Sequence, residues 1–390
     1  MQKAVFKALM AAVLGLTLAT PSHAQRFLRN FGLTAKEDLG RRIFFDTSLS
    51  SPPGQACSSC HDPAFAFSDP NAASPTSKGA NPEIRGSRNA PSIMYASFSP
   101  RFHFDRDEGL FIGGQFLDGR SPTVNDQAKQ PFLNPIEMGN ASGDEVVEKI
   151  RQADYAHLFE RVFGAGALAN PKSAYNKVGD ALAAFERSPA LRRFTSKYDY
   201  ALKGRARLTA QETRGRKLYE AADKGNCAAC HPNRPGADSS PPLFTDFTYD
   251  NLGVPSNPDN PFYSQPGAVN PLGKQFVDKG LGGRLDVFAE NGKFKVPTLR
   301  NIAVTGPYMH NGYFTNLRSV VEFYSNRDVK PVCPNRFTRT GEAQKLNCWP
   351  EPEVKENLNR DELGALNLSN QEIDDLVAFL KTLTDGYKPK

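Results

Sequence analysis

Two five-residue stretches combine cysteine and histidine at a spacing that can hold a metal cofactor. Both read Cys-x-x-Cys-His, with Cys57, Cys60 and His61 in the first stretch and Cys227, Cys230 and His231 in the second. Two thiols one helical turn apart can add to the two vinyl groups of a haem, and the adjacent imidazole can then bind the iron. A cysteine and histidine zinc site is the competing interpretation. Because the histidine follows the second cysteine directly, and does so twice, we predict two covalently bound haem c groups.

The first 24 residues have the pattern of a signal peptide. Lys3 and Lys7 precede an apolar run over residues 8–19, and a small-x-small cleavage site ends at Ala24. The apolar run is too short to span a bilayer, and no later stretch is comparable. We therefore expect export without a membrane span, and a periplasmic location in a Gram-negative cell. Haem attachment to Cys-x-x-Cys-His, which takes place on the exported side, agrees with this expectation.

The net charge gives little information about partners. The formal charge is +6, and removing the two signal-peptide lysines leaves +4. Lysine and arginine are interspersed with aspartate and glutamate, so we predict no nucleic-acid-binding patch. A mild positive balance also suits a soluble acidic partner.

Two cysteines lie outside the haem motifs, Cys333 and Cys348. In an oxidising compartment an even pair predicts a disulfide, here across fifteen positions of the chain. A bridge of that span contributes roughly 3 kcal/mol by the loop-entropy estimate. The competing interpretation, a reactive or metal-binding pair, has no nearby histidine to support it.

An internal repeat precedes each haem motif. Residues 33–44 and 208–219 both read Leu-Thr-Ala-x-Glu-x-x-Gly-Arg, followed after one residue by an aliphatic and an aromatic side chain. Thr34 and Thr209 have the pattern of helix N-caps, each with a glutamate three positions later that completes a capping box. We therefore predict a short helix before each haem motif and two duplicated domains.

Apolar periodicity predicts three further helices, at residues 145–163, 177–187 and 369–384. Tracts rich in proline, glycine and asparagine at 69–100 and 232–271 predict long loops that wrap cofactors. No run of alternating strands is evident, so the predicted fold is mostly α, with two cytochrome-c-like haem domains and long irregular loops. We place the signal peptide at residues 1–24, the N-terminal domain at 25–205 and the C-terminal domain at 206–390.

The chain resembles the bacterial dihaem cytochrome c peroxidases and their relative MauG, the dihaem enzyme that matures methylamine dehydrogenase. The resemblance extends from Leu33 to Thr384. Beyond the haem motifs it rests on three blocks, Arg88–Ser92, Phe116–Met138 and Phe294–Gly312. It implies that peroxide reacts at the N-terminal haem and that the C-terminal haem transfers electrons.

In this family the positions of Gln127 and Glu137 belong to the distal pocket of the peroxide-reacting haem. Peroxide heterolysis needs a group that moves a proton between the two oxygens and a partner that orients the molecule, and a carboxylate with an amide can do both. Without the resemblance, Glu137 reads as a first-turn residue and Gln127 as a surface residue. Some members carry a histidine that blocks this iron, but residues 62–92 contain none. We expect an open first iron, with His103 and His157 as structural histidines rather than ligands.

The resemblance also concerns the region between the haems. Asn89, Thr305 and Pro307 match positions that hold a calcium ion in the family, and one side-chain oxygen with two backbone carbonyls suits such a hard cation. The chain departs from the family at Leu117, where a tryptophan usually stands, and its only tryptophan is Trp349. A leucine offers no π-system as an electron relay between the haems.

The sixth ligand of the second haem separates the two branches of the family. The peroxidases use a methionine fourteen residues after the histidine of a Pro-Tyr-x-His motif, and MauG uses a tyrosine. Counting from His310 leads to Tyr324. A tyrosine on an amphipathic segment is otherwise an ordinary core residue, and Met309 is the nearest competing ligand. A phenolate ligand would favour higher oxidation states of the iron and lower its potential.

These features predict a periplasmic dihaem peroxidase. Hydrogen peroxide would be reduced at the His61 haem, with electrons passing through the His231 haem from a small cytochrome or cupredoxin. One alternative is MauG-like oxidation of a partner protein's side chain, which Tyr324 favours. The other is a non-catalytic carrier with two six-coordinate haems, which Gln127 and Glu137 argue against.

Overall fold

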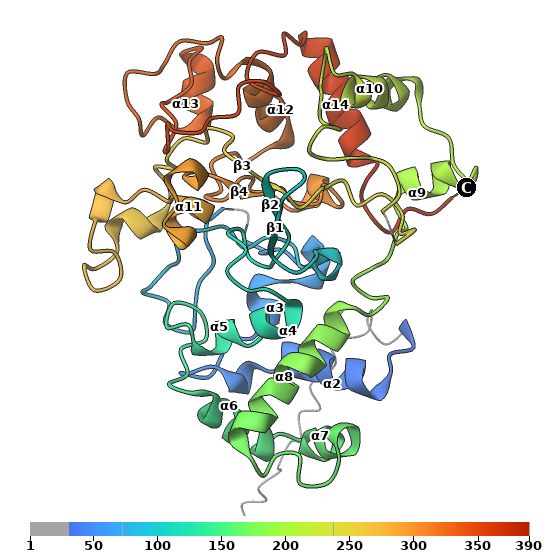
Figure 1. Cartoon of the computed structure of the whole chain (residues 1–390), viewed down its shortest axis with the longest axis vertical. Coiled ribbons are helices and arrows are strands. Elements are labelled where there is room, and N and C mark those ends of the chain that lie inside the picture. The colour runs from blue at the N-terminus through green and yellow to red at the C-terminus, as the bar shows by residue number, and fades with distance from the viewer. Residues whose placement is uncertain (1–30, 72, 237, 390) are drawn as a thin grey trace, which may run out of the picture.

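A computed structural model describes residues 31–71, 73–236 and 238–389 (Figure 1). The predicted signal peptide, residues 1–24, lies outside the described residues. Within the described part, no helix combines the length and apolar character needed to cross a bilayer.

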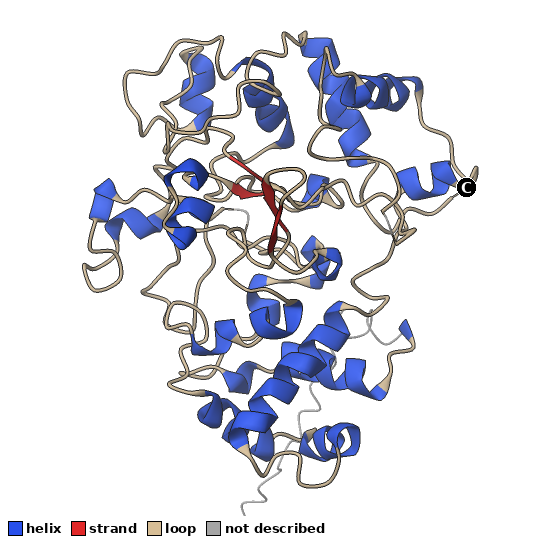
Figure 2. Cartoon of the chain, in the orientation of Figure 1, coloured by secondary structure: helices blue, strands red, loops and turns tan. Residues whose placement is uncertain are grey.

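Helices and long connecting loops make up most of the chain, and only four short strands are described (Figure 2). The first half contains α2 (Ala35–Phe44), α3 (Cys57–Cys60), α4 (Val124–Gln127), α5 (Gln130–Leu133), α6 (Gly143–Gln152), α7 (Ala156–Phe163) and α8 (Pro171–Glu186). The second half contains α9 (Lys197–Leu202), α10 (Ala210–Glu220), α11 (Gly280–Leu285), α12 (Leu317–Asn326), α13 (Thr340–Lys345) and α14 (Asn370–Lys381). This helix-rich architecture confirms the predicted class.

The strands form two antiparallel pairs near the middle of the molecule (Figure 1). β1 (His103–Asp105) pairs with β2 (Leu110–Ile112), and β3 (Tyr249–Asp250) pairs with β4 (Phe294–Lys295). They lie between the helices of the first half, at the bottom of the view, and those of the second half, at the top.

The internal repeat folds into two equivalent helix pairs. Thr34 caps α2 and Thr209 caps α10, and in both the glutamate three positions later completes the capping box. Helix α2 packs against α8, and α10 packs against α14. The apolar faces of these helices need a partner to be buried, so each repeat forms a core of its own with the later helix.

All three helices predicted from periodicity differ from the structure, although α14 differs only by ending at Lys381, three residues before the predicted end. Residues 145–163 form α6 and α7 rather than one helix, because Ala153 turns extended after α6. A continuous helix would place Asp154 on the same face as the buried Ile150 and Leu158, whereas the aspartate is exposed. Helix α8 begins six residues before the predicted start, capped by Asn170 with a proline in its first turn. Helix α14 has the predicted cap and capping box at its start.

Each half of the chain has a separate hydrophobic cluster. The first contains Phe44, Phe132 and Phe185, and the second contains Tyr219, Phe314 and Phe379 among its members. Tyr198 on α9 already belongs to the second cluster. The chain thus passes from one cluster to the other before residues 205 and 206, where we placed the domain boundary.

A disulfide joins Cys333 to Cys348 beside the second cluster. Trp349, next to it, is 2% exposed and accepts a backbone hydrogen bond from Cys333. This places the single tryptophan in a structural role in the second half.

Candidate active site

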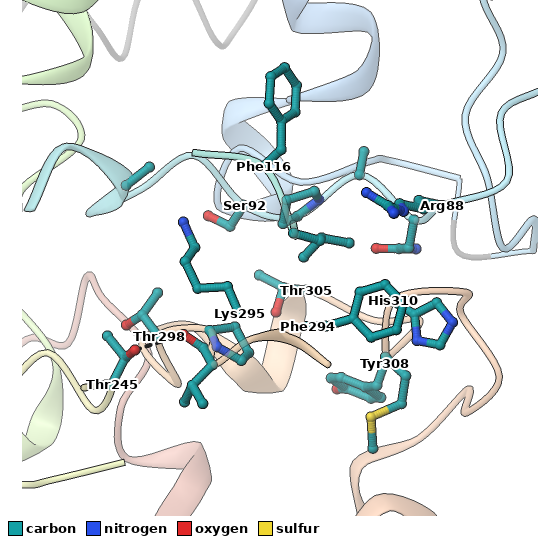
Figure 3. Close-up of a pocket in the computed structure, with 18 of the residues that line it drawn as sticks. Arg88, Ser92, Phe116, Thr245, Phe294, Lys295, Thr298, Thr305, Tyr308 and His310 are labelled. Carbon is teal, nitrogen blue, oxygen red and sulfur yellow. Dashed lines mark hydrogen bonds between the residues drawn. The ribbon is translucent and has the colours of Figure 1, made fainter. Parts of the chain in front are cut away.

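Both Cys-x-x-Cys-His motifs line one cavity of about 500 Å³ in the centre of the molecule. Figure 3 shows part of its wall: Arg88 and Ser92, from a loop of the first half, lie across from Phe294, Lys295 and Thr305 of the second half, whereas the Phe116 ring points away from them. The facing loops are tied together by Arg88, whose guanidinium pairs with Asp118 at 2.6 Å and with Asp278 at 2.7 Å. The cavity is therefore built by both halves.

The two histidines of the motifs are oriented in the same way. Nδ1 of His61 lies 3.1 Å from the carbonyl oxygen of Phe67, and Nδ1 of His231 lies 2.9 Å from that of Phe244. A ring whose Nδ1 hydrogen is held by a carbonyl keeps Nε2 available for a metal. Burial lowers the pKa of His61 and lowers that of His231 to about 4, so both rings are neutral, as an iron ligand must be.

The four motif cysteines are free of disulfides. Burial raises the pKa of Cys57, Cys60 and Cys227 to about 12, so these thiols carry no charge at neutral pH. Neutral buried sulfur suits an uncharged thioether. The paired thiols and the free imidazole nitrogens on one cavity wall fit a covalently attached haem at each motif.

Gln127 and Glu137 both line the cavity. Glu137 is close enough to both thiols of the first motif for its charge to raise their pKa values. Its carboxylate accepts a hydrogen bond from Asn134 at 2.8 Å. Burial raises the pKa of Glu137, and Arg120 and Asn134 partly oppose this. A carboxyl group with a raised pKa can hold a proton nearer neutral pH than a surface glutamate, which suits acid–base work.

Tyr324 lies on α12 and lines the cavity near the second motif. Burial raises its pKa, and Cys230 and Cys227 are close enough that their thiolate forms would add to the increase. Within the described residues, no hydrogen bond to its hydroxyl group is found. A phenol that faces a cavity in this way can bind a metal placed there.

Asn89, Thr305 and Pro307 also line the cavity. The Asn89 backbone N–H donates to the carbonyl oxygen of His310 at 2.7 Å, which joins its loop to the segment that follows Pro307. The Asn89 side-chain nitrogen donates to Pro75 at 3.1 Å, so its Oδ1 remains an acceptor. One amide oxygen and neighbouring carbonyls are the donors that a calcium ion prefers.

Neither of the remaining histidines reaches the cavity. His103 lies on β1, where its Nδ1 is 2.8 Å from the carbonyl oxygen of Arg101, and it is exposed. His157 is an exposed residue of α7. They are surface residues rather than the structural histidines that we expected.

Comparisons with known proteins identify the family of the chain. A family model described as di-haem cytochrome c peroxidase matches residues 34–207. Over 364 residues the chain is 40% identical to the methylamine utilization protein MauG of Paracoccus denitrificans, covering 90% of this chain and 89% of the relative. The chain belongs to the dihaem cytochrome c peroxidase and MauG family.

Other members of the family are similar over nearly the same length. The chain is 29% identical over 360 residues to the cytochrome c551 peroxidase of Nitrosomonas europaea, covering 90% of this chain and 80% of the relative. The crystal structure of the diheme peroxidase BthA from Burkholderia thailandensis E264 matches with 33% identity and a TM-score of 0.74, covering 91% and 87% of the two chains. This dihaem peroxidase family carries two haem groups, and the chain is an oxidoreductase of the haem peroxidase type.

The charged residues of the cavity wall that were not among the predicted site residues include Arg120, Lys295 and Glu186. Arg120 stacks its guanidinium 3.5 Å from the centre of the Phe116 ring and pairs with Asp118 at 3.0 Å. Lys295 donates to the carbonyl of Gly114, and burial lowers its pKa to about 8. Both lie in sequence blocks that carried the family resemblance, which was the available signal.

The third residue, Glu186, stands out when the two helix pairs are compared. Gly40 contacts Ala181 and Phe185, as Gly215 contacts Asp375 and Phe379, so Glu186 is the counterpart of Leu380. Both line the cavity, and Glu186 is only 6% exposed. Aligning α8 with α14 as an extension of the sequence repeat would have revealed that glutamate replaces leucine at this position.

Proposed function

We propose that the chain is a periplasmic dihaem c-type peroxidase that reduces hydrogen peroxide at the N-terminal haem. The observation that carries the proposal is that Glu137 lines the cavity beside the first motif and that Gln127 lines the same cavity. His61 and His231 would bind the two irons, and Cys57, Cys60, Cys227 and Cys230 would form the thioether bonds. The haem would supply the iron that binds peroxide and the orbitals that hold electrons.

In the proposed reaction Glu137 takes a proton from the iron-side oxygen of the peroxide and delivers it to the outer oxygen, which leaves as water. The Gln127 amide can orient the peroxide by donating or accepting a hydrogen bond. The raised pKa of Glu137 supports this role, because the same carboxyl group must both accept and release a proton.

The C-terminal haem would pass electrons from an external donor, a small cytochrome or cupredoxin. We place one haem in each of two cytochrome-c-like domains, and the packing of α9 with the second cluster favours a boundary just before Lys197. We further propose a calcium ion held by Asn89, Thr305 and Pro307 between them, and export through residues 1–24.

A second candidate function is MauG-like oxidation of a side chain of a partner protein. The Tyr324 phenol at the second motif favours it, because a phenolate ligand stabilises oxidised iron and lowers its potential. The 40% identity to a MauG protein supports the same candidate. Leu117 weakens it, since no aromatic relay stands at that position between the haems.

The experiment that tests the first proposal is an EPR spectrum of the ferric holoprotein, followed by addition of hydrogen peroxide. We expect one high-spin and one low-spin haem, and a change in the Soret band without prior reduction. Two low-spin signals would contradict the proposal and point to a cavity side chain such as Met138 as a blocking ligand.

A second assay distinguishes the two candidate functions. It measures how fast the protein, supplied with hydrogen peroxide, oxidises a reduced small cytochrome. Rapid turnover favours the peroxidase. Slow turnover, together with long-lived oxidised haems, favours the modification of a protein substrate.

A further inference from the structure

Tyr95 is buried in the cavity wall, and its hydroxyl group is hydrogen-bonded to a carboxylate. The side chain is 2% exposed, and its hydroxyl donates to Oδ2 of Asp385 at 2.7 Å. The same oxygen accepts a hydrogen bond from the backbone N–H of Phe194 at 2.9 Å. The phenol is thus fixed between one donor and one acceptor, and its proton points to a carboxylate oxygen.

Further hydrogen bonds fix the carboxylate of Asp385 in the position where it accepts from Tyr95. Its Oδ1 accepts from the backbone N–H of Thr195 at 2.8 Å and from the Thr195 hydroxyl at 3.1 Å. Its Oδ2 also accepts from the Asn301 amide at 3.0 Å. Asp385 is partly exposed. It therefore connects the buried phenol to solvent, which gives a proton a route out of the cavity wall.

Tyr95 lies close to the ligand side of the first motif. The carbonyl oxygen of Phe67 that faces His61 Nδ1 at 3.1 Å also accepts the backbone N–H of Ile93 at 3.2 Å. Ile93 precedes Tyr95 by two residues, a separation of at most about 7 Å along the chain. The segment that carries Tyr95 is thus joined to the carbonyl that orients the proximal histidine of the N-terminal haem, and Tyr95 lines the cavity that both motifs share.

The other tyrosines of the cavity wall lack such an acceptor in the described part of the chain. The Tyr308 hydroxyl donates to the backbone carbonyl of Ile302 at 2.9 Å, and a carbonyl cannot keep a proton at neutral pH. Tyr324 has no hydrogen bond to its hydroxyl. Oxidation of a phenol in a buried site needs a base for its proton, because a charged phenol radical cation would be left in a medium of low dielectric.

We propose that Tyr95 is a one-electron relay of the N-terminal haem and that Asp385 accepts its proton. This role rests on the proposed peroxide reaction, which supplies the oxidant. Reduction of one hydrogen peroxide to two water molecules takes two electrons and two protons. Tyr95 would give one of the electrons, and the external donor would give the other through the C-terminal haem. The O–H bond of Tyr95 breaks, its proton passes to Oδ2 of Asp385, and a neutral tyrosyl radical remains. A later electron from the donor and the returning proton restore the phenol.

Tyr95 also contacts residues at the junction of the two halves of the chain. The Tyr95 ring lies 4.9 Å from the Phe194 ring and 5.0 Å from the guanidinium of Arg300. Arg300 pairs with the buried Asp199 of the second half at 2.8 Å. The oxidising equivalent would thus be held where the two halves of the chain meet.

The test is freeze-quench EPR of the holoprotein after mixing with hydrogen peroxide. We expect an organic radical signal that narrows when the protein is made with ring-deuterated tyrosine. Tyr95→Phe should reduce the signal at least tenfold, because phenylalanine packs as tyrosine does but cannot be oxidised at this potential. Asp385→Asn should slow radical formation at least tenfold and remove its solvent deuterium effect, since the base is lost.

Tyr155→Phe is the matched control. The Tyr155 hydroxyl donates to Asp46 at 2.5 Å, so it has the same tyrosine–aspartate chemistry, but Tyr155 is not part of the cavity wall. This variant should keep the wild-type signal. A radical of unchanged size and line shape in Tyr95→Phe would overturn the relay while the peroxidase stands. A Soret band that does not respond to peroxide in the wild type would overturn both.

Discussion

A Cβ atom built on Gly40 would lie 1.9 Å from the carbonyl oxygen of Ala181, so the backbones of α2 and α8 are in direct contact. Gly215 and Asp375 repeat the arrangement between α10 and α14, again at 1.9 Å. In both pairs the nearest side-chain atom is the Cβ of a phenylalanine, Phe185 or Phe379, at 2.9 Å. Each helix pair thus depends on a glycine at the crossing point.

Gly40→Ala should lower the free energy of unfolding by about 1–3 kcal/mol or more, because the added methyl group meets backbone that cannot move aside. Gly341→Ala is the control, since a Cβ there meets nothing within 4 Å. In α13 that change should be neutral or stabilising by up to about 1 kcal/mol. Chemical denaturation of the holoprotein measures both. Equal stability of Gly40→Ala and the wild type would contradict the close contact of α2 and α8 at Gly40.

Glu186 should make the stability of the protein depend on pH. Burial raises its pKa to about 8, and Arg187 opposes this only in part, while an unfolded glutamate titrates near its ordinary value of about 4.3. A raised folded pKa means that the stabilising contribution is fully present below the unfolded value. It is then lost as the pH rises through about 8. Glu186→Gln should therefore reduce the loss of unfolding free energy between pH 5 and pH 9 by at least about 1 kcal/mol.

Other ionisable groups near α8 are paired, and we expect them to contribute less than Glu186 to the pH dependence of stability. Residues on the neighbouring helices form ion pairs with one another: Arg41 and Arg42 with Asp38, Lys129 with Asp126, Lys149 with Glu145, and Arg151 with Glu148. Cys57 faces Glu186 but would carry a thioether. Glu108→Gln, an exposed change of the same kind, should leave the pH profile as it is. An unchanged profile in Glu186→Gln would refute the prediction.

Glu137→Gln should slow the reaction with hydrogen peroxide by about 10² or more, the usual scale of general acid–base catalysis. The amide keeps the shape of the side chain but cannot transfer the proton. Stopped-flow absorption of the Soret band measures the rate, and Glu83→Gln, at an exposed position, should react as the wild type does. A wild-type rate in Glu137→Gln would remove this carboxylate from the mechanism.

Tyr324→Phe should convert the low-spin ferric haem of the second motif to another ligation state. The absorption and EPR spectra of the ferric protein report the change. Tyr308→Phe, also on the cavity wall but hydrogen-bonded to Ile302, should keep the wild-type spectra. Spectra of Tyr324→Phe that match the wild type would exclude this phenol and favour the peroxidase branch.

Features that depend on neighbours in the sequence were predictable. The helices after Thr34, Thr209 and Ser369 begin where their capping boxes predict, because a capping box involves only four consecutive residues. The division of residues 145–163 into two helices also has a local signal. In one continuous helix, Asp154 would place a charged side chain in the buried apolar stripe.

Features that depend on distant contacts could not be predicted in this way. The family resemblance identified Gln127, Glu137 and Tyr324, and all three line the cavity. Periodicity could not show that Glu186 faces that cavity, since a glutamate on a helix is usually exposed. It also could not bring together Tyr95 and Asp385, which are 290 residues apart.

That separation has a consequence in time. Tyr387 donates its backbone N–H to Thr195 at 3.0 Å, so the last turn of the chain, with Asp385, covers the wall that Tyr95 helps to form. At about 5–20 residues per second, this cover is synthesised roughly 15–60 s after Tyr95. The contact between Tyr95 and Asp385 therefore cannot form until nearly the whole chain has been made.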